Sequence, residues 1–222
     1  MKSVALIHTV KSVANTFEEK LRAGVREEIK VHNLLDDFLA NNPNEIGEFT
    51  IINCKRLFND IKNAELTGAD IIVTTCSTLT PVVDRIRPFI KVPVISIDDA
   101  LAKEAVNHGK KILVLATAQS TIEPTVNKIQ GEADKAGIEV SLDTRVCTPA
   151  FQALKALDME LHDKLLLEIA PELKGYHCIV LAQASMSHLE GAISDKCGCI
   201  VLSSPRLCIE QVGQLLDKLS NK

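Results

Sequence analysis

The chain repeats its own pattern, and this internal repeat constrains the fold more than any other feature. A β-branched apolar run ends in small polar residues at Ile71–Leu79, and the same form returns at Cys178–Met186. A shift of 107 residues superposes the two segments without a gap and places Gln183 over Cys76. We therefore expect two like halves, with a thiol in one and an amide at the equivalent position of the other.

The repeat extends to the start of each half, where Lys2–Thr9 lies over Lys110–Thr117. Each half has the pattern β-α-β-α-β-α-β. Nearly continuous β-branched runs are typical of parallel strands that are buried on both faces. We predict strands at about Val4–Thr9, Ile29–Leu34, Asp70–Thr75, Val94–Ile97, Ile112–Thr117, Ile138–Leu142, Cys178–Ala182 and Cys199–Ser203.

Helices are predicted between these strands. The segments Thr16–Glu19 and Ser120–Glu123 each match a capping box, in which a hydroxyl and a carboxylate satisfy the first free amides of a helix. Thr50–Leu66 carries its apolar residues along one helical face. The last helix, predicted at Leu207–Leu219, should pack back on the first half.

These elements predict an α/β fold of two pseudo-symmetric parallel-sheet domains with an interdomain cleft. The first domain should comprise residues 1–98 and 207–222, and the second residues 99–206. A chain of 222 residues is long enough for two small α/β domains, each with its own core.

Composition excludes several classes of function. The chain is 46% apolar with a net charge of −4, so it lacks the basic surface that binds nucleic acid. Aromatic residues make up 3% and Trp is absent, which argues against stacking platforms for bases. No apolar run reaches the ~20 residues of a membrane span, and no apolar leader precedes the first strand. We expect a cytoplasmic protein without membrane or nucleic-acid partners.

The seven cysteines indicate reduced thiols rather than a disulfide framework. Several, such as Cys178, begin apolar runs and are expected to be small buried hydrophobes. The Cys197-Gly198-Cys199 segment could suggest a metal, but it lacks a second pair of ligands. We therefore predict no metal site.

The candidate site residues stand where strands end and helices begin. Ligands of open parallel sheets bind beyond the carboxyl ends of the strands, and helix starts there favour carboxylates or phosphates. No Gly-rich dinucleotide or nucleoside-triphosphate motif occurs, so we expect no such cofactor. The candidate residues are His8, Thr9, Cys76, Ser77, Thr78, Thr117, Ser120, Gln183, Ala184 and Ser185.

Cys76 is the candidate base or nucleophile. It ends a strand and opens a helix, a position that favours the thiolate, and its Thr-Thr-Cys-Ser-Thr flank indicates an exposed polar setting. The alternative is a buried structural thiol. His8 could orient or deprotonate Cys76, or could be a solvent-facing loop histidine. His188, one turn after Gln183, is either a second base or a surface residue.

Two motifs resemble those of the aspartate/glutamate racemase superfamily, which includes hydantoin racemase, maleate isomerase and arylmalonate decarboxylase. Val73–Thr78 resembles the first cysteine loop of these enzymes, and Val180–Met186 resembles the second. His8-Thr9 stands where glutamate racemases carry Asp-Ser. The resemblance implies a small carboxylate or amino-acid substrate, no cofactor, and proton transfer at Cα by two cysteines. We also expect a homo-oligomer.

The chain departs from that pattern at Gln183, because an amide cannot shuttle a proton at neutral pH. We therefore predict a racemase-like isomerase that acts at the Cα of a small carboxylate with Cys76 as its base. Three alternatives stay open. They are a single-cysteine decarboxylase, a non-catalytic carboxylate-binding protein, and a cysteine hydrolase that uses Asp98 or Asp99 as its orienting carboxylate.

Overall fold

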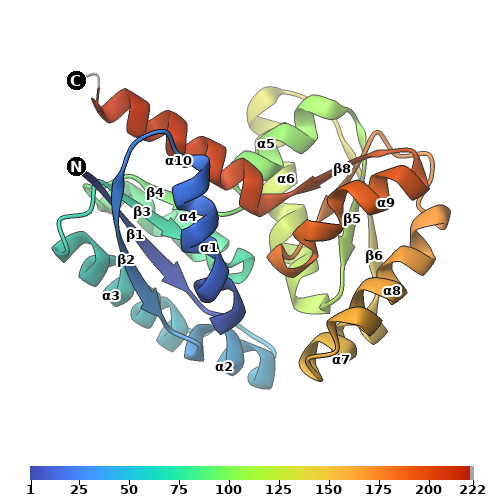
Figure 1. Ribbon diagram of the computed structural model, residues 1–222, viewed down its shortest axis with the longest axis horizontal. Helices are drawn as coiled ribbons and strands as arrows, with labels where there is room; N and C mark the ends of the chain where they lie inside the picture. Colours follow the sequence, from blue (N-terminus) through green and yellow to red (C-terminus); the bar gives the residue numbers. More distant parts are fainter. Residues whose placement is uncertain (221–222) are drawn as a thin grey trace. The chain divides into compact units, whose positions relative to one another are not determined.

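The computed structural model describes residues 1–220 and contains two compact units (Figure 1). The first unit comprises Met1–Asp99 with the C-terminal segment that starts at Pro205, and the second comprises Ala100–Ser204. Each unit holds one four-stranded parallel sheet with helices packed against it. The prediction of two pseudo-symmetric α/β domains is confirmed, whereas the predicted cleft between them stays a prediction.

The first unit is built on the strand order β2-β1-β3-β4. Its strands are β1 Lys2–His8, β2 Ile29–Leu35, β3 Ile71–Thr74 and β4 Val94–Ser96. Its α-helices are α1 Lys11–Gly24, α2 Phe38–Ile46, α3 Ile51–Leu66, α4 Thr80–Ile86 and α10 Ser204–Ser220, and its 3₁₀ turns are η1 Ser77–Leu79 and η2 Arg87–Phe89.

The second unit repeats this layout with the order β6-β5-β7-β8. Its strands are β5 Lys111–Ala116, β6 Ser141–Val146, β7 Cys178–Leu181 and β8 Ile200–Ser203. Its helices are α5 Asp99–His108, α6 Ile122–Ala136, α7 Thr148–Lys155, α8 Met159–Ile169 and α9 Glu190–Cys197, with 3₁₀ segments η3 Gln119–Thr121, η4 Ala170–Glu172 and η5 Ala184–Leu189. Within residues 1–220, no helix is long and apolar enough to cross a membrane.

The central strands of the two sheets pair in the same register. Val4 of β1 lies opposite Ile71 of β3, and Ile112 of β5 lies opposite Cys178 of β7. These are the residues that the internal repeat superposes. The repeat in the sequence therefore has a direct counterpart in the sheet geometry.

Apolar side chains on one face of each sheet form the cores that hold these strands in place. In the first unit, Ile7 and Ile72 pack with Leu57 and Ile61 of α3, all fully buried. The second unit has an equivalent cluster, in which β5 and β7 pack against α8 and α9. Full burial of each such side chain contributes roughly 1.5–3 kcal/mol. The cores therefore fix the strands whose ends carry the candidate residues.

Both predicted capping boxes are wrong. Thr16 lies inside α1, where its hydroxyl contacts a backbone carbonyl one turn earlier, and Thr121 precedes α6 without a side-chain cap. Helix α1 starts sooner than predicted, at Lys11, whereas Ser120 lies within the 3₁₀ turn η3 that precedes α6. A capping box does occur at α3, where Asn53 N donates to Thr50 Oγ1 and Thr50 N donates to Asn53 Oδ1 at 2.9 Å.

The strand predicted at Ile138–Leu142 begins later, at Ser141. Gly137 adopts the left-handed conformation with φ 66°, and Ile138 N donates to Ala133 O at 3.0 Å. These two residues terminate α6, because a glycine in this conformation lets the following amides bond the last helical carbonyls.

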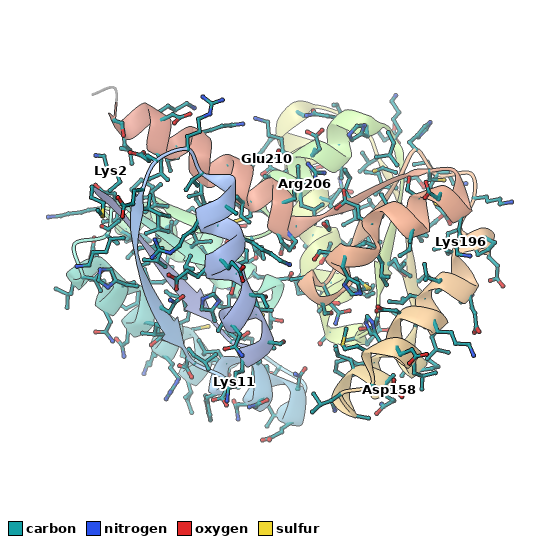
Figure 2. All side chains as sticks on the ribbon, viewed as in Figure 1. Lys2, Lys11, Asp158, Lys196, Arg206 and Glu210 are labelled. Atoms are coloured by element: carbon teal, nitrogen blue, oxygen red, sulfur yellow. The ribbon has the colours of Figure 1, made fainter. Side chains whose placement is uncertain are left out.

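A sharp turn separates α7 from α8. Leu157 has φ 61° and is the sole non-glycine residue with positive φ in the part of the chain that the structure describes. Asp158, labelled in Figure 2, follows it, and its carboxylate accepts a hydrogen bond from Leu161 N at 3.0 Å. The cap provides one of the missing partners at the start of α8, which offsets part of the cost of the left-handed residue.

A carboxyl pair lies beside the end of β2. Asp36 follows β2, is buried, and forms an ion pair with Arg56. Burial, the hydrogen bond with Asp36 and the charge of Asp36 raise the pKa of Asp60 to about 7, against the opposing charge of Arg56. Asp60 therefore retains a proton at pH values where most carboxyl groups are ionised.

We predict that Asp60→Asn flattens the pH dependence of stability between about pH 4 and 7. The pKa of Asp60 is higher in the folded than in the unfolded chain, so its stabilising contribution is complete at low pH and is lost as pH rises through about 7. Urea unfolding at pH 5 and pH 8 measures this difference. The exposed Asp37→Asn should keep the wild-type slope, and an unchanged slope in Asp60→Asn would contradict the assignment.

Candidate functional site

The register of the first sheet brings the ends of β1 and β3 together. Ile7 lies opposite Thr74, and Thr75 N donates to Ile7 O at 3.0 Å, which continues the pairing beyond the strand. His8 Nδ1 lies 2.8 Å from Thr75 Oγ1. Extending the same register by two residues beyond the Ile7–Thr74 pair places Thr9 opposite Cys76.

Cys76 has an extended backbone and directly precedes η1. Its side chain is partly exposed, while Ser77 is buried beside it. Asp98, which is 2% exposed, accepts hydrogen bonds from Ser77 Oγ at 3.1 Å and Thr80 Oγ1 at 3.2 Å. These bonds fix the turn after Cys76 and leave a reachable thiol on a rigid support.

His8 is buried, and both of its ring nitrogens have side-chain partners. Nδ1 contacts the Thr75 hydroxyl, and Nε2 lies 3.1 Å from Asn33 Oδ1. The amide of Asn33 donates to the carboxylate of Glu18, so its oxygen faces the ring and His8 Nε2 carries the proton. Nδ1 is then the acceptor for the Thr75 hydroxyl. His8 thus contacts the residue before Cys76.

Burial lowers the pKa of His8 below its usual value, and the Asn33 bond and the charge of Glu18 offset part of this effect. His8 is therefore held as the neutral imidazole. Two of the hydrogen bonds that Asp98 accepts come from the hydroxyls of Ser77 and Thr80, and His8 bonds Thr75 and Asn33. These bonds give no support to the Cys–His–carboxylate relay that a cysteine hydrolase uses.

Thr9 carries a buried hydroxyl without a hydrogen-bond partner. The residue is 2% exposed, and its Oγ1 is one of the unpaired buried polar atoms among the described residues. Leaving a buried hydroxyl unpaired costs about 1–3 kcal/mol. Because the continued register pairs Thr9 with Cys76, this unpaired hydroxyl is a candidate donor to a ligand oxygen.

Gln183 occupies the equivalent position in the second unit, at the end of β7. Its Oε1 accepts three hydrogen bonds, from Thr117 N at 2.6 Å, Thr117 Oγ1 at 2.9 Å and Ala118 N at 3.2 Å. The amide oxygen is therefore tied to the turn that follows β5. The sequence predicted that Gln183 and Thr117 would share one end of a sheet, and the structure brings them into direct contact.

The other predicted residues lie on the turns that follow the strands. Thr78 is half-buried in η1, Ser120 is exposed in η3, and Ala184 and Ser185 are half-buried in η5. All therefore lie at the carboxyl ends of their parallel sheets. Their assignment as substrate-binding residues stays a prediction.

Sequence reasoning missed a hydrogen-bonded group in the second unit. Asp163 of α8 contacts two histidines, with Oδ1 2.7 Å from His162 Nδ1 and Oδ2 2.7 Å from His188 Nε2. Although partial burial opposes it, these bonds keep the pKa of Asp163 below its usual value. The side chain of His188 is 47% exposed. No local motif links α8 to η5, so only the fold reveals the pair.

Several of the other cysteines are poor nucleophiles in this environment. Burial raises the pKa of Cys178 to about 11 and raises the pKa values of Cys197 and Cys208. Cys197 and Cys199 approach each other, with Cys199 N 3.4 Å from Cys197 Sγ. Within residues 1–220, no cluster of three or more His, Cys, Asp or Glu side chains has a geometry that could hold a metal ion.

The sequence also matches the model of the Asp/Glu/hydantoin racemase family over residues 5–212. The chain belongs to this family. The match covers both units and includes the loops of Cys76 and Gln183.

Solved racemase structures share the fold. A glutamate racemase from Bacillus anthracis is 14% identical with a TM-score of 0.76, and the match covers 98% of this chain and 82% of that one. An aspartate racemase from Picrophilus torridus is 16% identical with a TM-score of 0.71, covering 98% and 95%. An allantoin racemase from Pseudomonas fluorescens is 16% identical with a TM-score of 0.64, covering 98% and 92%.

We predict that iodoacetamide modifies Cys76 before the buried thiols, because Cys76 combines partial exposure with a polar, rigid turn. Limited labelling followed by peptide mass spectrometry gives the order of modification. Cys54, which is also partly exposed, is the internal comparison, and Cys178 and Cys208 should react last. Faster labelling of Cys54 would argue against a specially reactive Cys76.

Proposed function

We propose that this family member is a racemase-like isomerase that removes the proton at the Cα of a small carboxylate or amino acid, with Cys76 as the base. The observation that carries the proposal is the position of Cys76. Its partly exposed thiol stands on a turn fixed by hydrogen bonds, and continuing the β1–β3 register pairs Cys76 with Thr9, whose buried hydroxyl is unpaired. A base and an oxygen-binding donor thus lie together, as proton abstraction next to a carboxylate requires.

His8 acts through Thr75 in this proposal rather than by direct contact with the thiol. The neutral ring accepts from the Thr75 hydroxyl at 2.8 Å and donates to Asn33, which is held in turn by Glu18. This chain of bonds fixes the backbone immediately before Cys76. It also keeps a positive charge away from the thiol, so His8 is a positioning residue that leaves Cys76 to exchange the proton.

Return of the proton requires a second acid–base group, because Gln183 cannot carry one. We assign this role to His188, whose ring is half exposed and whose Nε2 is held by Asp163. A carboxylate on one nitrogen stabilises the protonated ring and orients the other nitrogen. In the same proposal Ser77, Thr78, Ser120, Ala184 and Ser185 bind the substrate, whereas Thr117 is engaged by Gln183.

The proposed enzyme works without a cofactor, in the cytoplasm and as a homo-oligomer. A single-thiol decarboxylase is the second candidate, favoured by the absence of a thiol at position 183, since loss of carbon dioxide needs only one proton donor. A carboxylate-binding protein without turnover is the third. Proton exchange at Cα distinguishes all three, because only the isomerase exchanges its substrate without consuming it.

We predict that the protein catalyses exchange of the Cα proton with solvent deuterium and that Cys76→Ala abolishes it. Each enantiomer of aspartate, glutamate, alanine and a 5-substituted hydantoin is incubated in D₂O and followed by ¹H NMR. Loss of a positioned base lowers the rate by about 10²–10⁴-fold. Cys54→Ala, a partly exposed cysteine of the same unit, is the matched control and should retain exchange. Carbon dioxide release without exchange would favour the decarboxylase.

We predict that His188→Asn slows racemisation more than it slows exchange. Cys76 can still remove and return a proton on its own side of the planar intermediate, while delivery from the other side loses its donor. Polarimetry and NMR on one substrate give the two rates. His108→Asn is the control, because His108 also pairs with a carboxylate, Glu104 at 3.1 Å, within the second unit. Equal loss of both rates would remove His188 from this role.

A further inference from the structure

Thr9 of the first unit and Thr117 of the second occupy equivalent positions but differ in their hydrogen bonds. Continuing the strand registers pairs Thr9 with Cys76 in the first unit and Thr117 with Gln183 in the second. The extensions are matched by equivalent backbone bonds, Thr75 N to Ile7 O at 3.0 Å and Ala182 N to Leu115 O at 2.9 Å. The two threonines are therefore structural equivalents.

Their hydroxyls nevertheless differ in what they bind. Thr117 donates to Gln183 Oε1, together with the amides of Thr117 and Ala118. Thr9 is equally buried, yet its hydroxyl has no partner. The amide oxygen of Gln183 thus shows where this type of turn places an acceptor oxygen, and the first unit has no side-chain oxygen of its own in that place because Cys76 ends in sulfur.

We propose that Gln183 determines specificity by filling the oxygen-binding turn of the second unit from within the protein, so that only the Thr9 turn of the first unit accepts a ligand carboxylate. The inference rests on the proposed function and narrows its substrate class. A substrate with one carboxylate satisfies the Thr9 turn. A carboxylate that reaches the Thr117 turn finds its donors already engaged by Gln183.

The chemistry of the two acceptors supports this division. Three donors that converge on one oxygen form a site suited to an anion, and a carboxylate oxygen would bind there more strongly than a neutral amide. A ligand, however, must displace a side chain that is tethered to the same unit and pays no entropy of association. At ordinary ligand concentrations, the Gln183 amide therefore stays bound to the donors of the Thr117 turn and excludes a ligand carboxylate.

Acetate is the probe that tests this inference, with amide resonances of ¹⁵N-labelled protein as the readout. In the wild type, acetate should shift the amides of Thr9 and Val10 and leave those of Thr117 and Ala118 unchanged. In Gln183→Ala the second pair should respond as well. Thr9→Val should weaken the first response about tenfold, the loss expected for one hydrogen bond to a charged acceptor.

Gln119→Ala is the matched control, because Gln119 is exposed on the turn next to Thr117 and has no bond to it among those the structure describes. Gln183→Ser is the second variant, used if the alanine variant loses the dispersed spectrum of a folded protein. Acetate shifts at Thr117 and Ala118 in the wild type would overturn the inference, as would folded position-183 variants that gain no response.

The titration needs no turnover, so its result is independent of the proposed activity. Absence of deuterium exchange together with the expected titration would remove the isomerase and keep the role of Gln183. Deuterium exchange together with acetate shifts at Thr117 and Ala118 in the wild type would keep the isomerase and remove the role of Gln183.

Discussion

The pairing of β1 with β3, and of β5 with β7, is the constraint on which the candidate site depends. Parallel pairing aligns the carboxyl ends of adjacent strands, so residues separated by more than sixty positions become neighbours. His8 thereby contacts Thr75, and Thr117 contacts Gln183. A shift of one residue in the strand pairing would move every side chain of that strand to the opposite face of the sheet, and both contacts would be lost. The buried apolar clusters prevent such a slip, because they fix which side chains of β1 and β5 face the helices.

Duplication followed by divergence explains why two similar turns now carry different chemistry. Backbone bonds after the strands are the same in both units, so the scaffold of the turn is retained. What changed is the side chain that the turn presents: sulfur at Cys76 and an amide at Gln183. The first is polarisable, ionisable and partly exposed. The second is neutral and engaged with three donors. Two turns that are equivalent in the internal repeat therefore need not be equivalent in chemistry, and the family membership alone does not reveal this difference.

Much of the fold could be predicted because the nearly continuous β-branched runs and the internal repeat both indicate buried parallel strands. The central strands, the helix at Thr50–Leu66 and the final helix follow from hydrophobic spacing alone. The start of the edge strand β6 could not be predicted from hydrophobic spacing, because most of its residues are exposed. In addition, the residues before it belong to the turn that ends α6. The capping signals failed because Thr and Ser followed by Glu recur within and beside helices that begin elsewhere.

Prediction of the site was limited by partners that have no sequence signature. Strand ends pointed to Cys76, Thr9 and Gln183, but Asn33 and Asp163 reach the site region only through β2 and α8. These partners decide the chemistry. Asn33 uses the oxygen of its amide to hold the proton of His8 on Nε2, which makes Nδ1 an acceptor and separates the ring from the thiol. The sequence predicted that His8 and Cys76 would be neighbours, but in the folded chain the ring of His8 bonds Thr75 and Asn33. The proposed function therefore takes the acid–base partner of Cys76 from another part of the chain.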